Sequence, residues 1–151
     1  MNPLMAQAIS IGVLLAFWDF ISGLVHLSIY PGIIAMGCFY ASGGKTEGLV
    51  KSLAGLLSGA FWALVATQLG VILGEVRVLN ALVVGLAGVV IVFQSRFPIL
   101  SFMAGAIVGA GAMLSFPNLL PEGLIKFVGA LIAGVILGYL SEMLTAKLKK
   151  A

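Results

Sequence analysis

Long apolar runs follow one another along nearly the whole chain, and polar residues occur mainly in the short gaps between them. Hydrophobic residues make up 62% of the chain and charged residues only 9%, whereas about 25% of a typical soluble domain is charged. So few polar residues cannot cover a chain in water, so the pattern predicts one integral membrane domain, residues 1–151, in a lipid bilayer. The net charge of +3 fits loop lysines that face an anionic leaflet, and we expect no nucleic-acid partner.

The apolar segments predict an all-α membrane protein with about six transmembrane helices. The expected segments are 8–29, 31–42, 49–74, 78–93, 98–116 and 124–144. The second is short, because only about fourteen residues separate Pro31 from the end of the paired Gly43-Gly44, whereas a full crossing needs about twenty. Transport proteins often build their sites on short hydrophobic pieces that proline or glycine interrupts.

The basic residues outside the apolar segments predict how the chain is oriented. With six crossings, both termini share one side of the membrane with the loops after the second and fourth segments. That side holds Lys45, Lys51, Arg96, Lys147, Lys149 and Lys150, and the other side holds Arg77 and Lys126. Because cytoplasmic loops are rich in Lys and Arg, both termini are predicted to be cytoplasmic. A re-entrant second segment would make the number of crossings odd and would remove this asymmetry.

A twelve-residue pattern occurs twice and predicts an internal repeat. Residues 48–59 (GLVKSLAGLLSG) align with residues 123–134 (GLIKFVGALIAG), and five of the twelve positions are identical. The segment before each block is opened by an aromatic-Pro pair, Tyr30-Pro31 or Phe97-Pro98. Two three-helix copies, 8–74 and 76–146, would enter the membrane from opposite sides because three is odd, and inverted repeats are common in transporters. The alternative is chance similarity between helices rich in Gly, Leu and Ala.

Small residues recur at a spacing of four, which places them on one helix face where two backbones approach closely. The pairs are Gly55/Gly59, Gly105/Gly109, Ala130/Gly134 and Gly134/Gly138. Packing within the chain is the favoured interpretation, and a subunit interface or a smooth pore lining are the alternatives. Because six short helices enclose little interior, we expect a solute path to require a homo-oligomer.

Asp19 is unusual for its position near the middle of the first apolar segment. A carboxylate at the centre of a membrane helix costs about 2.5–3.5 kcal/mol on insertion scales, so it should face water or a partner. Ser22 and His26 follow three and seven residues later, which predicts a polar stripe on one face. This stripe has two equally weighted interpretations, a solute site and a structural cluster with Asn80 or Gln68.

Motifs of soluble enzymes are missing from the sequence, including a Gly-rich phosphate loop, a metal-ligand cluster and a nucleophile elbow. The single cysteine, Cys38, excludes an intrachain disulfide and makes no metal site alone. We therefore expect neither an enzyme nor a bound cofactor or metal.

Four motifs together resemble a bacterial inner-membrane family, domain of unknown function 1097, over nearly the whole chain. The motifs are residues 37–44 (GCFYASGG), 58–63 (SGAFWA), 105–110 (GAIVGA) and 138–142 (GYLSE). Tyr40 stands where a second Phe is expected, and it adds a hydroxyl group. The resemblance implies a fold and a bacterial inner membrane. A weaker likeness, at the level of architecture, is to urea-type channels, which also pair inverted repeats and work as oligomers.

These features predict a small channel or transporter for a small polar solute or ion, working as a homo-oligomer. The solute path is expected to include Asp19, Ser22, His26, Pro31, Cys38, Phe39, Tyr40, Ser42, Pro98, Gly105 and Gly109. The glycines expected to pack helices or subunits together are Gly55, Gly59, Gly134 and Gly138. The alternative is a membrane scaffold that transports nothing, or an accessory subunit of another membrane complex.

Overall fold

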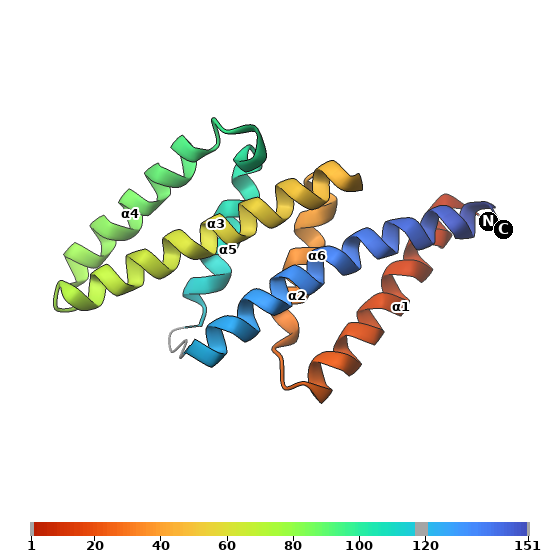
Figure 1. The fold of residues 1–151 in the computed structure, drawn as a ribbon, viewed down its shortest axis with the longest axis horizontal. Helices are drawn as coiled ribbons and strands as arrows, with labels where there is room; N and C mark the ends of the chain where they lie inside the picture. Colours follow the sequence, from red (N-terminus) through yellow and green to blue (C-terminus); the bar gives the residue numbers. More distant parts are fainter. Residues whose placement is uncertain (1, 117–120, 151) are drawn as a thin grey trace. The chain divides into compact units, whose positions relative to one another are not determined.

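The computed structural model describes residues 2–116 and 121–150, and the core of the predicted loop after residue 116 lies outside these ranges. The elements are α1 (Pro3–Leu24), α2 (Ile29–Ala41), α3 (Lys45–Ile72), α4 (Arg77–Gln94), η1 (Pro98–Leu100), α5 (Met103–Leu114) and α6 (Pro121–Lys150) (Figure 1). Helices α1, α3, α4 and α6 are long and apolar enough to cross a membrane, and α2 and α5 are shorter apolar helices. The predicted all-helical fold with six apolar helices is thereby confirmed.

The end of α1 and the start of α3 differ from the predicted segments. α1 ends at Leu24, and His26 lies in the connection to α2 with a positive φ of 53°. α3 begins at Lys45 rather than at Leu49, so residues expected in a loop form its first turn. A local apolar pattern does not include this turn because its side chains are polar.

The second and fifth segments also begin differently from the prediction. Pro31 lies in the first turn of α2, two residues after the helix begins at Ile29. Pro98 opens the short 3-10 turn η1, and α5 begins only at Met103. The proline therefore starts α5 less directly than the aromatic-Pro pattern predicts.

The helices form two compact units, which we describe separately. Unit 1 comprises Met1–Val50 and Leu120–Ala151, and unit 2 comprises Lys51–Leu119. Unit 1 thus contains α1, α2, the first turns of α3, and α6, whereas unit 2 contains the rest of α3 with α4, η1 and α5. Each unit therefore combines helices from both predicted repeats.

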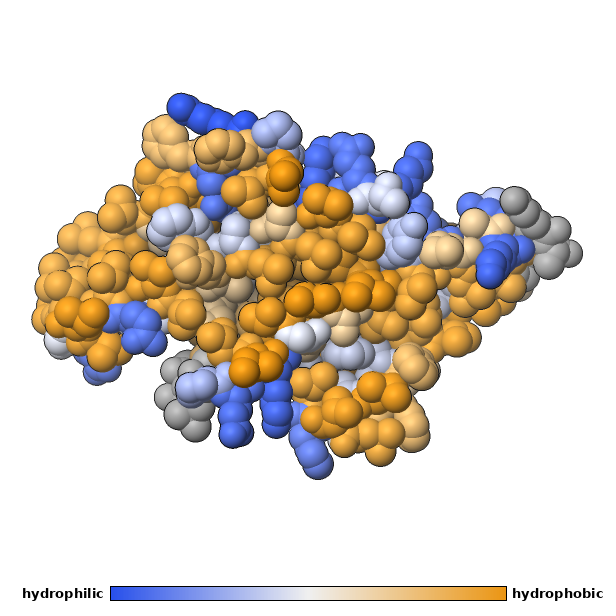
Figure 2. Space-filling view, viewed as in Figure 1, coloured by the Kyte–Doolittle hydropathy of each residue, from blue (hydrophilic) through white to orange (hydrophobic). Residues whose placement is uncertain are grey.

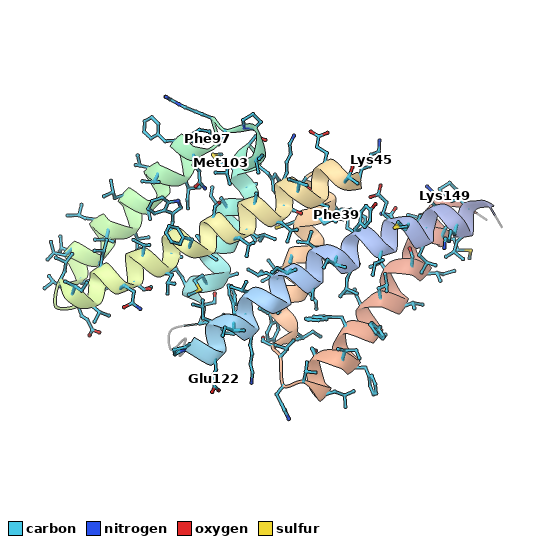
Figure 3. The ribbon with its side chains drawn as sticks, viewed as in Figure 1. Phe39, Lys45, Phe97, Met103, Glu122 and Lys149 are labelled. Carbon is cyan, nitrogen blue, oxygen red and sulfur yellow. The ribbon has the colours of Figure 1, made fainter. Side chains whose placement is uncertain are left out.

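In unit 1, α6 packs against α2 through glycine contacts. A Cβ at Gly134 would overlap the backbone of Gly32, and a Cβ at Gly138 would lie 2.7 Å from the ring of Phe39. Phe39 is fully buried and lies against α6 (Figure 3). Trp18 on α1 also packs against Gly32, and its indole N–H donates to the carbonyl of Ile29 at 3.0 Å. Close backbone approach of this kind holds membrane helices together by van der Waals contact.

In unit 2, glycines bring α3 against α5 in the same way. A Cβ at Gly59 would overlap the backbone of Ala106, and a Cβ at Gly109 would overlap that of Leu56. Both Ala106 and Leu56 are fully buried. The two contacts lie one turn apart along each helix, so the backbones of α3 and α5 stay close over a full turn.

The outer surface is mainly apolar, as a lipid environment requires. Hydrophobic residues cover most of the face seen in Figure 2. Large exposed hydrophobic side chains occur on all four long helices, for example Leu4, Ile72, Val78 and Ile125. With four membrane-span candidates, this surface identifies a multi-pass membrane protein.

Candidate functional site: a polar pocket at one end of unit 1

Two of the four sequence motifs, the first and the last, lie against each other along α2 and α6. Phe39 packs on Gly138, and its ring meets that of Tyr139 edge-on with centroids 6.2 Å apart. The hydroxyl groups of Tyr40 and Ser141 share a hydrogen bond. Motifs far apart in sequence therefore form one continuous contact in unit 1.

Glu142 joins this contact to the start of α3. Its Oε2 accepts a hydrogen bond from the backbone N–H of Lys45 at 2.6 Å. The N–H groups of a first helical turn have no partner within the helix and carry partial positive charge, so a carboxylate stabilises them. Gly43 and Gly44, with φ values of 99° and 67°, make the turn, and a Cβ at Gly44 would lie 3.0 Å from Glu142 Oε2. The positive φ values favour glycine at both positions, and at Gly44 a Cβ would also press on the Glu142 carboxylate.

Buried hydroxyl groups connect α1 to α6 near the same end. Ser10 and Thr145 share a hydrogen bond, and the Thr145 hydroxyl also lies 2.7 Å from the backbone oxygen of Ser141, to which it can donate. Ser10 and Ser141 are fully buried. Since a buried hydroxyl in an apolar setting needs a partner, these pairs fix the beginning of α1 beside the end of α6 (Figure 1).

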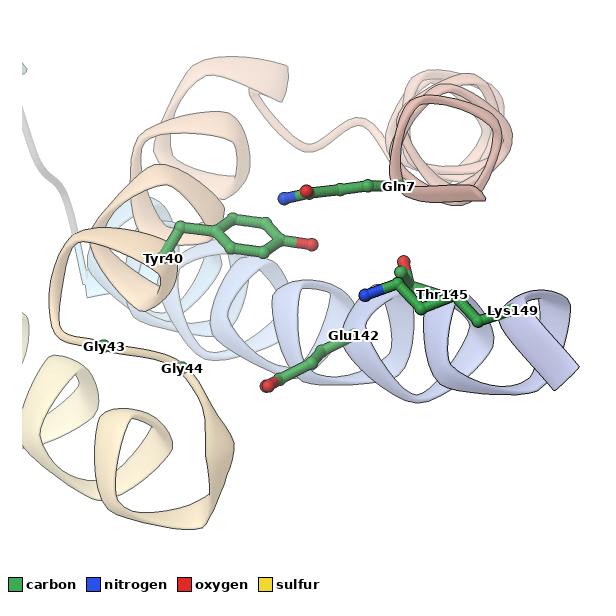
Figure 4. A pocket seen from close by; sticks show the side chains of 7 residues that line it. All are labelled: Gln7, Tyr40, Gly43, Gly44, Glu142, Thr145 and Lys149. Carbon is green, nitrogen blue, oxygen red and sulfur yellow. The ribbon is translucent and has the colours of Figure 1, made fainter. Parts of the chain in front are cut away.

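A cavity of about 260 Å³ opens beside these groups, and we call it pocket A. It is lined by Gln7 on α1, by Tyr40, Gly43 and Gly44 at the end of α2, and by Glu142, Thr145 and Lys149 on α6 (Figure 4). The amide of Gln7 and the hydroxyl of Tyr40 point into the same space in Figure 4. Pocket A thus gathers a carboxylate, an ammonium, an amide and hydroxyl groups in a chain that is 62% hydrophobic.

Glu142→Ala is expected to loosen the first turn of α3 by about 1 kcal/mol, because the Lys45 N–H loses its acceptor. Glu142→Gln keeps an acceptor oxygen and should loosen the turn less. Hydrogen–deuterium exchange of the amides at 45–48 in detergent measures the effect, with the exposed neighbour Met143→Ala as the matched control. Exchange in Glu142→Ala that is as slow as in the wild type would exclude the capping role.

The predicted path residues of α2 divide between pocket A and the helix contacts. Tyr40 lines the pocket, whereas Pro31, Cys38 and Phe39 are buried in the packing of unit 1. The hydroxyl of Ser42 lies 2.8 Å from the carbonyl oxygen of Phe39 and 2.9 Å from that of Gly48. Ser42 therefore holds the turn that leads to pocket A and does not line the pocket.

The predicted polar stripe on α1 does not form. Ser22 is buried, and its hydroxyl donates to the backbone carbonyl of Asp19 at 3.0 Å, whereas the Asp19 side chain is exposed. Because α1 ends at Leu24, His26 does not continue that helix face. Asp19 and His26 are exposed whereas Ser22 is buried, and none of them lines pocket A.

The predicted path residues of the second repeat lie in unit 2, and none of them lines pocket A. Pro98 is exposed in η1. Gly105 and Gly109 are buried, and Gly109 faces the backbone of Leu56. These two glycines therefore lie in the packing of α5 on α3.

Sequence reasoning missed four of the residues that line pocket A. They are Gln7, Glu142, Thr145 and Lys149. Glu142 is the last residue of the fourth sequence motif, and its place in that motif was the signal that could have identified it. Gln7 precedes the first predicted segment, so it was not considered as part of a helix.

Unit 2 contains a second polar group, which joins α3 to α4. The indole N–H of Trp62 donates to Gln94 Oε1 at 3.0 Å, and Gln94 Nε2 donates to the hydroxyl of Ser58 at 2.9 Å. These hydrogen bonds satisfy one another, so we assign them to packing. Within the described ranges, no three His, Cys, Asp or Glu side chains are grouped so as to hold a metal ion.

The chain is similar to several bacterial proteins along most of its length. "Uncharacterized protein YahC" of Escherichia coli strain K12 is 30% identical, over 96% of this chain and 94% of that protein. "Inner membrane protein YcdZ" of the same strain is 29% identical, over 92% of this chain and 83% of that protein. The protein of that name in Salmonella typhimurium strain LT2 is 30% identical, over 74% of this chain and 71% of that protein.

No solved structure matches the chain. Residues 8–146 match the family described as "Protein of unknown function (DUF1097)". This match and the similarity of the relatives along the chain show that the protein belongs to that family.

Proposed function

We propose that the protein is a small transporter or channel of the bacterial inner membrane, built from two inverted repeats and selective for a small polar solute. The relatives named inner membrane protein support this location. The predicted orientation, with both termini in the cytoplasm, is part of the proposal.

The match between two glycine contacts is the observation that carries the proposal. The alignment of the repeats places Gly59 of α3 and Gly134 of α6 at the same position. Gly59 meets the backbone of Ala106 on α5, and Gly134 meets the backbone of Gly32 on α2. The third helix of each repeat therefore packs on the second helix of the other. Chance similarity in composition gives no reason for the same contact to occur twice.

Inverted repeats favour transport because they supply two related halves that can open a site to either side of the membrane in turn. Pocket A provides polar groups at one such end. The predicted topology assigns this end to the cytoplasm, together with Lys45 and Lys149. Since the contact of Gly134 with Gly32 closes α2 against α6, we propose that a homo-oligomer completes the solute path.

A non-transporting scaffold is the second candidate, and the exposure of Asp19 favours it. Phe17 and Phe20 beside it are also exposed, so a carboxylate lies on an apolar face of α1. A carboxylate in contact with lipid is costly, and a helix of another membrane protein would remove that cost. This candidate predicts assembly with a partner and no flux.

Purified protein in liposomes should conduct some small polar solutes and exclude others. Tyr40→Trp fills part of pocket A and should lower the flux by roughly tenfold or more, the scale of steric selection in a binding pocket. Tyr30→Trp is the matched control, because Tyr30 is 69% exposed and outside the pocket. Stopped-flow light scattering or radiolabel uptake measures the flux.

Two outcomes would contradict the proposal. One is liposomes that are no more permeable than protein-free liposomes to every solute and ion of a broad panel. The other is equal flux through Tyr40→Trp and Tyr30→Trp. Absence of flux together with loss of a partner chain from Asp19→Asn would establish the scaffold instead.

A further inference from the structure

Unit 2 contains a cavity of about 410 Å³, which we call pocket B. It lies where α3 ends and α4 begins, and these helices are joined by a short turn (Figure 1). Its lining residues are Ala66, Thr67, Gly70 and Val71 on α3, Glu75 in the turn, and Asn80 and Val84 on α4. The turn is made by Gly74 and Glu75, with φ values of 79° and 57°.

Pocket B and pocket A occupy related positions in the repeats. The register that pairs Gly59 with Gly134 also pairs Thr67 with Glu142, and Gly70 with Thr145. Each pocket is thus lined by the same turns of a third helix.

The first helices of the repeats supply a matching amide to each pocket. Gln7 is the fifth residue of α1, and Asn80 is the fourth residue of α4. Each pocket also contains one threonine and one glutamate, Thr145 with Glu142 in pocket A and Thr67 with Glu75 in pocket B. The same three kinds of side chain therefore recur in both pockets.

Pocket B has more hydrogen-bond acceptors than donors. The Oδ1 of Asn80 is buried and has no hydrogen-bond partner among the described residues. The Thr67 hydroxyl donates its proton to the carbonyl oxygen of Leu64 at 2.8 Å, so toward the cavity its oxygen can act only as an acceptor. Glu75 adds a carboxylate. A buried acceptor without a donor costs about 1–3 kcal/mol, so a molecule that brings N–H groups would relieve a cost already present.

Pocket A also contains hydrogen-bond acceptors, beside the N–H donors of Lys149 and Gln7. The hydroxyl of Thr145 lies 2.7 Å from the carbonyl oxygen of Ser141 and also shares a hydrogen bond with Ser10. In unit 2 the hydroxyl of Thr67 lies 2.8 Å from the carbonyl oxygen of Leu64. Glu142 has one oxygen on the Lys45 N–H, and its second oxygen retains acceptor capacity. The amide of Gln7 points toward the Tyr40 hydroxyl across the cavity (Figure 4).

We propose that pockets A and B are two related sites for one small solute that presents N–H donors, an amine or an amide. The predicted topology assigns pocket A to the cytoplasmic end of α3 and pocket B to its periplasmic end, so each would be the first site met from its side. This inference rests on the proposed transport function and names its substrate class. In each pocket the amide side chain orients the N–H groups, and the glutamate accepts them.

Equilibrium dialysis of the full-length protein in nanodiscs tests the inference with two probes, methylammonium as a charged N–H donor and acetamide as a neutral one. Glycerol, which brings only O–H donors, is the comparison solute. We expect saturable binding of one N–H probe at two sites per chain. Gln7→Ala and Asn80→Ala should each weaken one site by roughly tenfold or more, and the double variant should lose both.

Gln68→Ala is the matched control, because this amide is exposed on α3 and lines neither pocket. It should keep both sites. Asn80→Ala removes an unpartnered buried acceptor, and Gln7→Ala adds a strong helix former to α1, so both variants should fold. Gel filtration of each nanodisc sample confirms folding before dialysis.

Binding and flux are measured separately, and either can be absent without the other. The two results therefore distinguish a failure of this inference from a failure of the proposed function. If the variants remove two binding sites and the protein gives no flux, the pockets are supported as binding sites and the transport proposal is contradicted. Flux without saturable binding of either N–H probe would overturn the inference and keep transport. Binding that is equal in the wild type and in the double variant, or glycerol binding as tight as that of both N–H probes, would also overturn it.

Discussion

Gly134→Ala should lower the free energy of unfolding by about 2–3 kcal/mol, because the new methyl group has no space. A Cβ at this position overlaps the backbone of Gly32, which cannot rotate away as a side chain can. α2 and α6 would have to separate along their whole contact, and Phe39 would lose its place on Gly138. Thermal or denaturant unfolding in detergent measures the change.

The same α6 helix supplies the control. Gly129 has open space at its Cβ position, so Gly129→Ala should leave stability unchanged or raise it by up to about 1 kcal/mol through helix propensity. Gly59→Ala tests the matching contact in unit 2 and should cost as much as Gly134→Ala. A loss from Gly134→Ala no larger than that from Gly129→Ala would contradict the backbone contact. A large loss from Gly134→Ala alone would contradict the match between the repeats.

The long helices were predictable because each is a nearly continuous apolar run, and such a run has few alternatives in a membrane. The start of α3 was not predictable in this way. Its first turn depends on the positive φ values of Gly43 and Gly44 and on Glu142, which is distant in sequence. A local pattern carries no information about a cap that comes from another helix. The end of α1 depends in a similar way on the left-handed conformation of His26.

Pocket A shows the same limit for the candidate site. The sequence indicated Tyr40 and the turn at Gly43-Gly44, because they belong to the short segment that follows Pro31 and to the first of the four motifs. Gln7 lies near the start of α1 and Lys149 near the end of α6, and they join the pocket only through helix packing. Asp19, the most unusual residue by position, lies elsewhere, because burial depends on which helix face meets a neighbour.

The lengths of α2 and α5 are the most demanding part of the proposed topology. With 13 and 12 residues, they are about 20 Å and 18 Å long, whereas the hydrocarbon core is about 30 Å thick. Inverted repeats nevertheless require each of them to carry the chain across. Local thinning of the bilayer, or flanking backbone that other helices shield from lipid, would make this possible.

Labelling from each side of the membrane should therefore give opposite results on the two sides of each short helix. In a Cys38→Ser background, single cysteines are placed before and after each helix at Ser28, Thr46, Arg96 and Ser115. None of these positions lies in a glycine contact, so the variants should fold.

A membrane-impermeant maleimide, applied to right-side-out and to inverted vesicles, is the most direct test of the central claim that two inverted repeats build this protein. Cysteines at Ser28 and Ser115 should react only in right-side-out vesicles, and those at Thr46 and Arg96 only in inverted vesicles. If Ser28 and Thr46, or Arg96 and Ser115, react from the same side, the helix between them does not cross, and the inverted repeat is excluded.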